Sequence, residues 1–406
     1  MLLLPFAVSL EAAPVPVKIM PGGGITRDAK PYFIKGAGGT ERMEELAGRG
    51  GNSVRTWSTD GLAAILDAAQ KNSLTVCAGI WLEPECSWFS YAKPEHCARQ
   101  MERVQKAVRA FRDHSALLCW GLGNEAEGDG RNTAYWKQLD ALAQMVHRED
   151  PAHPAFTAVA GLSKEKAEGL NAHTPHLDFV GINTYGALPG LRKHLADVKW
   201  TRPWVVTEFG PQGFWERPKA PWGAPLEQTS TEKAVMMRAA YQKAIAPAGD
   251  CWGGYAFLWG HKQEATSTWF GLFTPEGEAT AAIDVLQELW TGKAPSNRAP
   301  AVEGLTSTAA KATLAPGEFF TASAKATDAD GDTLTWHWTV TSESAGRDSK
   351  GKEKVPAPVP ASIVKADGSA AAFRAPDQPG SWRVFLRVTD GKGHAATANF
   401  PFRVAK

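Results

Sequence analysis

Eight short apolar runs recur along the chain up to residue 259, and they restrict the possible folds more than any other feature. They cover residues 32–36, 53–57, 74–81, 117–122, 155–159, 179–183, 204–207 and 255–259. Between them lie segments with apolar residues three or four positions apart, such as 61–70, 98–112, 135–148 and 231–245. Strands that alternate with amphipathic helices predict βα units around a parallel sheet. Eight such units favour a closed (β/α)8 barrel, or TIM barrel.

An open, doubly wound α/β sheet is the structural alternative to the barrel. Such sheets often bind nucleotides, and a glycine-rich phosphate turn then follows the first strand. No turn of the GxGxxG or GxxxxGK type follows the run at 32–36. The barrel is therefore the preferred fold class for this part of the chain.

The chain of 406 residues is long for one ordinary domain, and its composition changes near residue 300. A helix-like stretch at 281–290 is followed by turn formers and charges, which indicate a linker over 293–300. Beyond it, short alternating runs such as 334–340 and 382–388 predict an all-β sandwich. We therefore expect a barrel over 19–292 and a sandwich over 301–406.

Residues 1–18 are expected to form a separate N-terminal arm. The arm combines an apolar run with small residues around Ala12 and Ala13, as a secretory signal does, although the basic start of such a signal is missing. The alternative is an apolar arm of the mature protein. The run is too short to cross a bilayer and no other apolar stretch reaches about 20 residues, so we expect no membrane span. A signal would place the protein in a secreted, periplasmic or cell-surface location.

The charges of the chain nearly cancel, with 44 Lys and Arg against 43 Asp and Glu. A net charge of +1 gives no long-range attraction for nucleic acids or anionic membranes, so a neutral substrate fits better. The five cysteines lack the paired spacing of a zinc site or a disulfide scaffold. Cys77 and Cys119 lie in apolar runs and are expected to be buried thiols, whereas the pairing of Cys86 with Cys97 is left open. We expect no metal and no other cofactor.

Glu125 and Glu208 follow the fourth and the seventh apolar run. In a (β/α)8 barrel the carboxyl ends of the strands form the face that carries the active site. Cleavage of a glycosidic bond needs two carboxyls, one protonated and one ionised, on either side of the scissile bond. We therefore interpret Glu125 and Glu208 as a catalytic pair that meets across the barrel mouth; the alternative is a structural role in ion pairs. A gap of about 5 to 5.5 Å predicts retention of configuration, and roughly 6.5 to 9.5 Å predicts inversion.

At these residues the sequence resembles the clan of retaining glycoside hydrolases that share a (β/α)8 barrel. Asn124-Glu125 is similar to the Asn-Glu pair after strand four, which implies that Glu125 is the acid/base and that Asn124 binds the sugar 2-hydroxyl. Glu208 resembles the strand-seven nucleophile. The other matching positions are Arg55 in Asn52-Ser-Val-Arg55, Asn183 and Tyr185 in Asn183-Thr-Tyr185, and Trp259. The resemblance implies that Arg55 and Tyr185 support the nucleophile and that Trp259 forms the floor of the site.

Residues 30–36 and 52–57 resemble family 2 barrels most, with a secondary similarity to fungal β-1,3-glucanosyltransferases. Family 2 enzymes usually carry β-sandwich domains before the barrel, and the sequence shows none there, so their exo-acting substrates are not assumed. We expect a retaining β-glycoside hydrolase or transglycosylase, endo-acting on a β-linked glucan or a related oligo- or polysaccharide. The alternative is a non-catalytic carbohydrate-binding or adhesive surface protein.

Tryptophan is abundant, with 16 residues, and several lie near predicted strand ends. Aromatic faces stack on the apolar faces of pyranose rings, although many tryptophans simply belong to the core. We expect Trp57, Trp88 and Trp259 to be sugar platforms and the others, including Trp215, to be packing residues. Further polar residues follow the strands and are candidates for substrate subsites or for solvated surface: Glu83, Glu85, Glu127, Asp129, Glu216, His261 and Glu264.

Two acidic turns mark the predicted sandwich, Asp328-Ala-Asp330-Gly-Asp332 and Asp390-Gly391. They resemble turns in immunoglobulin-like, cadherin-like and polycystic-kidney-disease-type modules of extracellular enzymes. Alternating acids with a glycine can present oxygens to Ca²⁺, but the full spacing and the terminal Glu of an EF-hand are missing. We favour a plain hairpin turn, and an immunoglobulin-like sandwich for the second domain.

Overall fold

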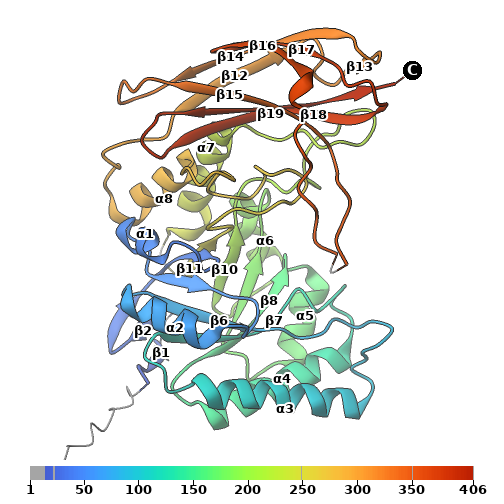
Figure 1. Ribbon diagram of the computed structural model, residues 1–406. Helices are drawn as coiled ribbons and strands as arrows, with labels where there is room; N and C mark the ends of the chain where they lie inside the picture. The colour runs from blue at the N-terminus through green and yellow to red at the C-terminus, as the bar shows by residue number, and fades with distance from the viewer. Residues whose placement is uncertain (1–13, 22, 248, 350, 406) are drawn as a thin grey trace, which may run out of the picture.

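A computed structural model describes residues 14–405 of the chain apart from Gly22, Ala248 and Lys350. The signal-like start of the arm expected over residues 1–18 therefore lies outside the described residues. Among the described helices, none is both long enough and apolar enough to cross a membrane. Figure 1 shows two bodies, a mixed α/β body and a layered β body that rests on it.

Eight parallel strands close into a barrel, as the eight apolar runs predict. The ring closes where the last strand pairs with the first, which excludes an open doubly wound sheet. The eighth strand lies earlier than the predicted run at 255–259 and ends at Ala256, so Trp259 belongs to the loop that follows. In barrel order the strands are β4 (Ile34–Gly38), β5 (Ser53–Arg55), β6 (Thr75–Ile80), β7 (Leu117–Asn124), β8 (Ala155–Ala160), β9 (Phe179–Asn183), β10 (Trp204–Phe209) and β11 (Cys251–Ala256).

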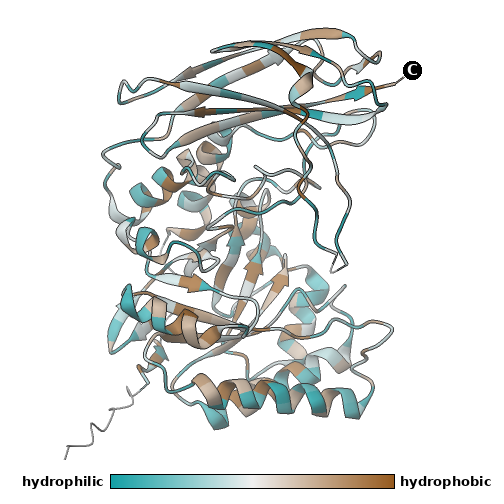
Figure 2. Ribbon diagram, in the orientation of Figure 1, coloured by the Kyte–Doolittle hydropathy of each residue, from teal (hydrophilic) through white to brown (hydrophobic). Residues whose placement is uncertain are grey.

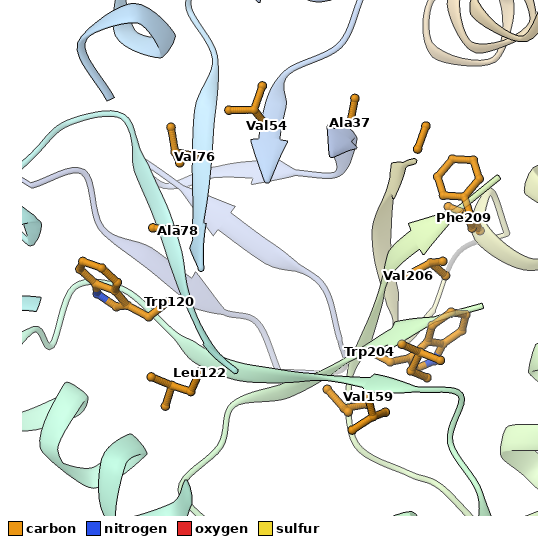
Figure 3. Close-up of a cluster of buried hydrophobic side chains, with 14 of the residues drawn as sticks. Ala37, Val54, Val76, Ala78, Trp120, Leu122, Val159, Trp204, Val206 and Phe209 are labelled. Carbon is orange, nitrogen blue, oxygen red and sulfur yellow. The ribbon is translucent and has the colours of Figure 1, made fainter. Parts of the chain in front are cut away.

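Helices cover the outside of the barrel (Figure 1). Their apolar faces bury residues such as Leu66 and Leu139 against outward side chains of the strands, and Figure 3 shows part of this core, including Val54 and Val206. In Figure 2, α3 presents hydrophilic residues along its outer side. The helices are α1 (Met43–Gly48), α2 (Leu62–Lys71), α3 (Pro94–Phe111), α4 (Thr133–Glu149), α5 (Lys164–His173), α6 (Leu191–Asp197), α7 (Ser230–Ala240) and α8 (Ala281–Thr291).

Local side-chain bonds fix where two of these helices begin. Thr229 caps α7: its hydroxyl accepts from the Glu232 amide at 3.1 Å, and the Glu232 carboxylate accepts from the Thr229 amide at 2.8 Å. Asn132 caps α4 by accepting from the amides of Ala134 and Tyr135. Such caps satisfy amides that have no partner inside the helix.

A small antiparallel sheet closes the bottom of the barrel. It consists of β1 (Val17–Ile19), β2 (Ile25–Arg27) and β3 (Lys30–Tyr32), so the first strand begins just before the expected start of the barrel domain. Val17 and Ile25 pack into a core with Leu118, Phe179 and Trp252 from the barrel interior. The amino-terminal end of the barrel is therefore filled, and its carboxyl-terminal face is the one left for a site.

Two four-stranded sheets form the second body, as the alternating runs predict. They enclose a core of their own that includes Trp338, Phe373 and Phe402. The strand β13 (Thr313–Leu314) runs parallel to its neighbour, whereas the remaining pairs are antiparallel. One sheet has the order β12 (Ala301–Ser307), β14 (Phe319–Thr327), β17 (Ala370–Arg374), β16 (Ile363–Asp367), and the other has the order β13, β19 (Ala395–Val404), β18 (Gly380–Thr389), β15 (Thr335–Ser342).

Polar side chains join the sandwich to the barrel. Arg383 on β18 is 1% exposed and donates to the Pro225 carbonyl at 2.8 Å, while Glu343 neutralises its charge at 2.9 Å. Asn399 on β19 donates to the Glu227 carboxylate at 2.6 Å. Buried hydrogen bonds to charged groups are directional, so these contacts fix one orientation of the two bodies.

The five cysteines carry no disulfide. Cys77 and Cys119 are buried neighbours on β6 and β7, as expected of small apolar core residues. Cys86 and Cys97, whose pairing the sequence leaves open, are both free thiols, and Cys97 contacts the Tyr91 carbonyl at 3.4 Å.

The barrel closure generates a stability prediction at Gly253 on β11. This glycine has a φ of +118°, and a Cβ there would overlap the backbone of Ile34, its partner on β4. We expect Gly253→Ala to lower Tm in thermal unfolding by more than about 3 °C. Gly304, which has open space around its Cα, is the matched control, and Gly304→Ala should leave Tm within about 1 °C. Equal effects of the two substitutions would contradict the strained closure.

Candidate active site

A cavity of about 830 Å³ opens at the carboxyl ends of the barrel strands. Glu125 follows β7 directly and Glu208 lies in β10, so the two predicted carboxyls come from strands that β8 and β9 separate in the ring. Both line the cavity, together with the predicted site residues Trp57, Asn124, Asn183 and Tyr185. Arg55, at the end of β5, does not line the cavity but forms an ion pair with Glu208.

Glu208 accepts hydrogen bonds from three different side chains. Arg55 Nη1 lies 2.9 Å and Trp57 Nε1 lies 2.8 Å from its Oε1. The Tyr185 hydroxyl lies 2.8 Å from its Oε2. An ionised carboxylate only accepts hydrogen bonds, so three donors around a residue that is 7% exposed suit the charged form of Glu208.

Arg55 is the hub of this arrangement, because its guanidinium joins three strands. Its Nη1 also donates to the Thr207 carbonyl at 2.9 Å, and its Nη2 donates to Asn124 Oδ1 at 2.6 Å. The residue is 2% exposed, so its charge needs a close anion to offset the loss of water. Glu208 is that anion, and the pair also fixes the amide of Asn124.

Glu125 has a different environment from Glu208. It is exposed to solvent at the cavity, with a left-handed φ of +53°, and accepts a bond from Asn183 Nδ2 at 2.7 Å. Partial loss of hydration, followed by the negative charges of Glu208 and Glu127, raises the pKa of Glu125 against the opposing effect of Asn183. A carboxyl of this kind keeps its proton to a higher pH than an ordinary glutamic acid.

Asn183 connects the two carboxyls. Besides the bond to Glu125, its Nδ2 lies 3.1 Å from Asn124 Oδ1, and its Oδ1 accepts from the Thr207 hydroxyl at 2.7 Å. A continuous chain of polar contacts therefore runs from Glu208 through Arg55, Asn124 and Asn183 to Glu125. The network orients side chains from four strands, β5, β7, β9 and β10, around one cavity.

The structure places two of the tryptophans elsewhere than the sequence predicts and brings a further one to the cavity. Trp57 lines the cavity, but Trp88, although 66% exposed, lies outside it. Trp259 is 1% exposed and packs against Phe273 with ring centroids 5.3 Å apart, so it cannot form the floor of the site. The cause is the early end of β11, which places Phe257 rather than Trp259 at the cavity. Trp215, assigned to packing, is 54% exposed and lines the cavity.

Lys262 is a further cavity residue that the sequence did not single out. It follows β11 and forms an ion pair with Glu264 at 2.5 Å. Its position among polar residues after a strand was the available signal. Of the seven candidate subsite residues, Glu216 and Glu264 line the cavity, whereas Glu83, Glu85, Glu127, Asp129 and His261 do not.

Glu216 holds two loops of the cavity wall together. Its Oε2 accepts from the amides of Gly186 at 2.9 Å and Gly213 at 2.7 Å. The first glycine follows Tyr185, and Trp215 precedes Glu216 in the sequence. The carboxylate therefore positions both Tyr185 and Trp215 at the cavity.

The acidic turns of the sandwich lie side by side. Asp328, Asp332 and Asp390 each place a carboxylate oxygen within 4.8 Å of the others. The Lys392 ammonium is 2.5 Å from Asp332, and its charge offsets part of their repulsion. Asp330 instead forms an ion pair with Arg298 at 2.8 Å.

The raised pKa of Glu125 predicts a stability gain when the residue cannot ionise. The folded state holds this proton more tightly than the unfolded chain, so ionisation destabilises the fold as pH rises past the ordinary glutamate pKa of about 4.3. We expect Glu125→Gln to raise Tm at neutral pH, with a difference that shrinks toward about pH 4. Glu168→Gln on the surface of α5 is the control. A Glu125→Gln effect that does not depend on pH would contradict the assignment.

The part of the chain that carries the two glutamates is similar to a known family of enzymes. Residues 60–215, which include both Glu125 and Glu208, match the model described as glycosyl hydrolases family 2, TIM barrel domain. A β-galactosidase of Leuconostoc mesenteroides subsp. mesenteroides is 25% identical over 126 residues, which is 29% of this chain and 10% of the relative. A β-glucuronidase of Sus scrofa is 23% identical over 217 residues, 49% of this chain and 32% of the relative.

Solved structures with the same fold include two bacterial β-glucuronidases. That of Bacteroides uniformis has a TM-score of 0.53 at 15% identity and covers 96% of this chain and 48% of its own. That of Ruminococcus gnavus has a TM-score of 0.54 at 16% identity and covers 69% of this chain and 53% of its own. The chain thus spans about half of these structures and a smaller part of the curated relatives. At such identities the structures show the fold alone, and the family match covers residues 60–215, where the barrel is similar to the TIM barrel domain of family 2 glycosyl hydrolases.

Proposed function

We propose that the chain cleaves β-glycosidic bonds with retention of configuration, with Glu208 as nucleophile and Glu125 as acid/base. The observation that carries the proposal is the contrast between two carboxyls in one cavity. Glu208 is surrounded by three donors, and Glu125 has a raised pKa. A carboxylate that accepts several hydrogen bonds, beside a carboxyl that keeps its proton to a higher pH, is the arrangement that the nucleophile and acid roles require.

In the first step Glu208 attacks the anomeric carbon and a glycosyl ester forms. The bond to the leaving oxygen breaks, and Glu125 gives its proton to that oxygen. In the second step the ionised Glu125 takes a proton from water or from a sugar hydroxyl. The oxygen so activated attacks the anomeric carbon and releases Glu208. Water as acceptor gives hydrolysis, and a sugar gives transglycosylation.

The charges around the cavity favour a neutral sugar. Of the described residues that line it, Lys262 is the one with a positive charge, and Glu264 neutralises it at 2.5 Å. Arg55 is likewise occupied by Glu208 and Asn124. A uronate would bring a carboxylate beside Glu125, Glu208 and Glu216 without a free cation to bind it. We therefore propose a neutral β-glycan, although β-glucuronidases occur among the relatives.

Aromatic side chains at the cavity support a saccharide ligand. Trp57 and Trp215 stand in a cluster with Tyr185 and Phe257, and their rings meet edge to face at 5.7 to 6.1 Å. Such rings present apolar faces for pyranose units while the polar network binds the hydroxyls. We propose a β-linked glucan or a related oligo- or polysaccharide as substrate.

The proposal also covers the location of the protein and the class of its second domain. We propose that it acts outside the cytoplasm and that the sandwich is an immunoglobulin-like module. The apolar start of the chain and the acidic turns at 328–332 and 390–391 support this. A polysaccharide substrate fits such a location.

Two substitutions test the roles of the glutamates. Glu208→Ala and Glu125→Gln should each lower kcat by at least about a thousandfold, and azide should restore turnover in Glu208→Ala by replacing the lost nucleophile. Glu168→Gln should retain full activity. Product configuration, read by proton NMR during turnover of an aryl β-glycoside, should be retained in the wild type. Full activity in either active-site variant would contradict the assigned roles. Sugar binding without cleavage would favour the alternative, a non-catalytic carbohydrate-binding protein.

A second test concerns the charge of the sugar. We expect the wild type to cleave an aryl β-glucoside with a kcat/KM at least about tenfold above that for the aryl β-glucuronide. Glu264→Gln frees the Lys262 ammonium and should raise the relative rate on the glucuronide. A wild type that prefers the glucuronide would contradict the neutral-sugar proposal while leaving the glutamate roles intact.

A further inference from the structure

The loop between β11 and α8 forms one wall of the cavity and turns sharply at its tip. Lys262 and Glu264 line the cavity from this loop. Glu264 and Thr266 pair across the tip through backbone bonds of 3.1 and 2.7 Å. Ala265 between them has a φ of +59°, a conformation that an alanine rarely adopts. A turn of this kind persists only when its surroundings hold it.

A hydrogen bond from the sandwich stabilises this turn. The Ala265 amide donates to Glu353 Oε2 at 2.8 Å. Glu353 belongs to the long hairpin that leaves β15 and reaches from the sandwich toward the barrel in Figure 1. A carboxylate that accepts from an amide makes a charge-assisted bond, which is stronger than a bond between neutral groups.

Contacts within the hairpin fix the position of Glu353. Its Oε1 accepts from Arg347 Nη2 at 2.9 Å, and a backbone bridge joins the same two residues. The Arg347 guanidinium also donates to the Gly351 carbonyl at 2.7 Å, and the backbone amide of Lys354 donates to the Gly346 carbonyl at 3.0 Å. One carboxylate oxygen of Glu353 therefore accepts from Arg347 within the hairpin, and the other accepts from the Ala265 amide of the loop. The contacts within the hairpin hold Glu353 in the position from which it contacts Ala265.

The base of the loop is anchored separately, at Glu227, which also accepts a hydrogen bond from Asn399 of the sandwich. The hydroxyls of Thr266 and Thr268 donate to Glu227 at 2.6 and 2.9 Å, and Lys233 pairs with that carboxylate at 2.5 Å. Loss of Glu353 would thus release the tip at Ala265 and leave the base of the loop in place. The network around Glu208 makes no contact with the hairpin among the described residues.

We propose that Glu353 is a positioning residue of the active site, through which the sandwich sets the place of Lys262 and Glu264 at the cavity wall. In this arrangement the second body completes the binding surface for the sugar. The kinetic consequence rests on the proposed function. Since the hydrogen bonds around Glu208 involve no residue of 262–266, Glu353 acts on substrate binding more than on the chemical step.

Kinetics with an aryl β-cellobioside distinguish this role from a merely structural one. Glu353→Ala in the full chain should raise KM by roughly threefold to tenfold and change kcat by less than about twofold. Glu353→Gln keeps an acceptor for the Ala265 amide and should lie between Glu353→Ala and the wild type. Glu303→Ala, on the outer surface of the sandwich, is the matched control and should equal the wild type. A KM for Glu353→Ala equal to that of the wild type, whether or not Tm changes, overturns the inference.

Amide hydrogen exchange tests the same contact without any cleavage. In the unliganded full chain, the peptide covering 262–268 should exchange at least about tenfold faster in Glu353→Ala than in the wild type. Glu303→Ala should leave that rate unchanged. Unaltered exchange in Glu353→Ala overturns the inference even if the enzyme is active, and faster exchange upholds the contact even if no glycoside is cleaved. Failure of the proposed function and failure of this inference are therefore distinguishable.

Discussion

The buried ion pair between Arg55 and Glu208 is the interaction on which the rest of the site depends. Arg55 is 2% exposed and Glu208 is 7% exposed, so each charge is costly without the other. Arg55 also reaches the Thr207 carbonyl and the Asn124 amide. Removing Arg55 would leave a buried carboxylate without its cation, and would release the Asn124 amide, which contacts Asn183, the hydrogen-bond donor to Glu125. The pair therefore sets both the charge and the geometry of the cavity.

Much of the fold and part of the site follow from local patterns in the sequence. Alternating periods of two and about four residues predict the eight βα units, and the carboxyl ends of parallel strands must meet at one face of the barrel. Arg55, Asn124 and Glu208 lie at such ends, which is why their proximity was predictable. The structure also confirms an all-β second body, whose core comes from alternating apolar residues on its strands.

Other features lie beyond local patterns. Trp259 was misplaced because the apolar run at 255–259 continues past the end of β11 at Ala256, and hydrophobicity alone does not mark where a strand stops. Trp88 is exposed on a loop whose path depends on tertiary contacts. The contact of Glu353 with Ala265 joins residues from two bodies, and no periodicity or spacing announces it.

The central claim is that Glu208 forms a covalent bond to the sugar, and mass spectrometry of a trapped intermediate tests it most directly. The protein would be incubated with an activated 2-deoxy-2-fluoro β-glucoside, which slows both steps and lets the glycosyl ester accumulate. The account predicts one adduct per chain, located after digestion on the peptide that contains Glu208 and missing in Glu208→Ala. An adduct on another residue, or an equal adduct in Glu208→Ala, would contradict it.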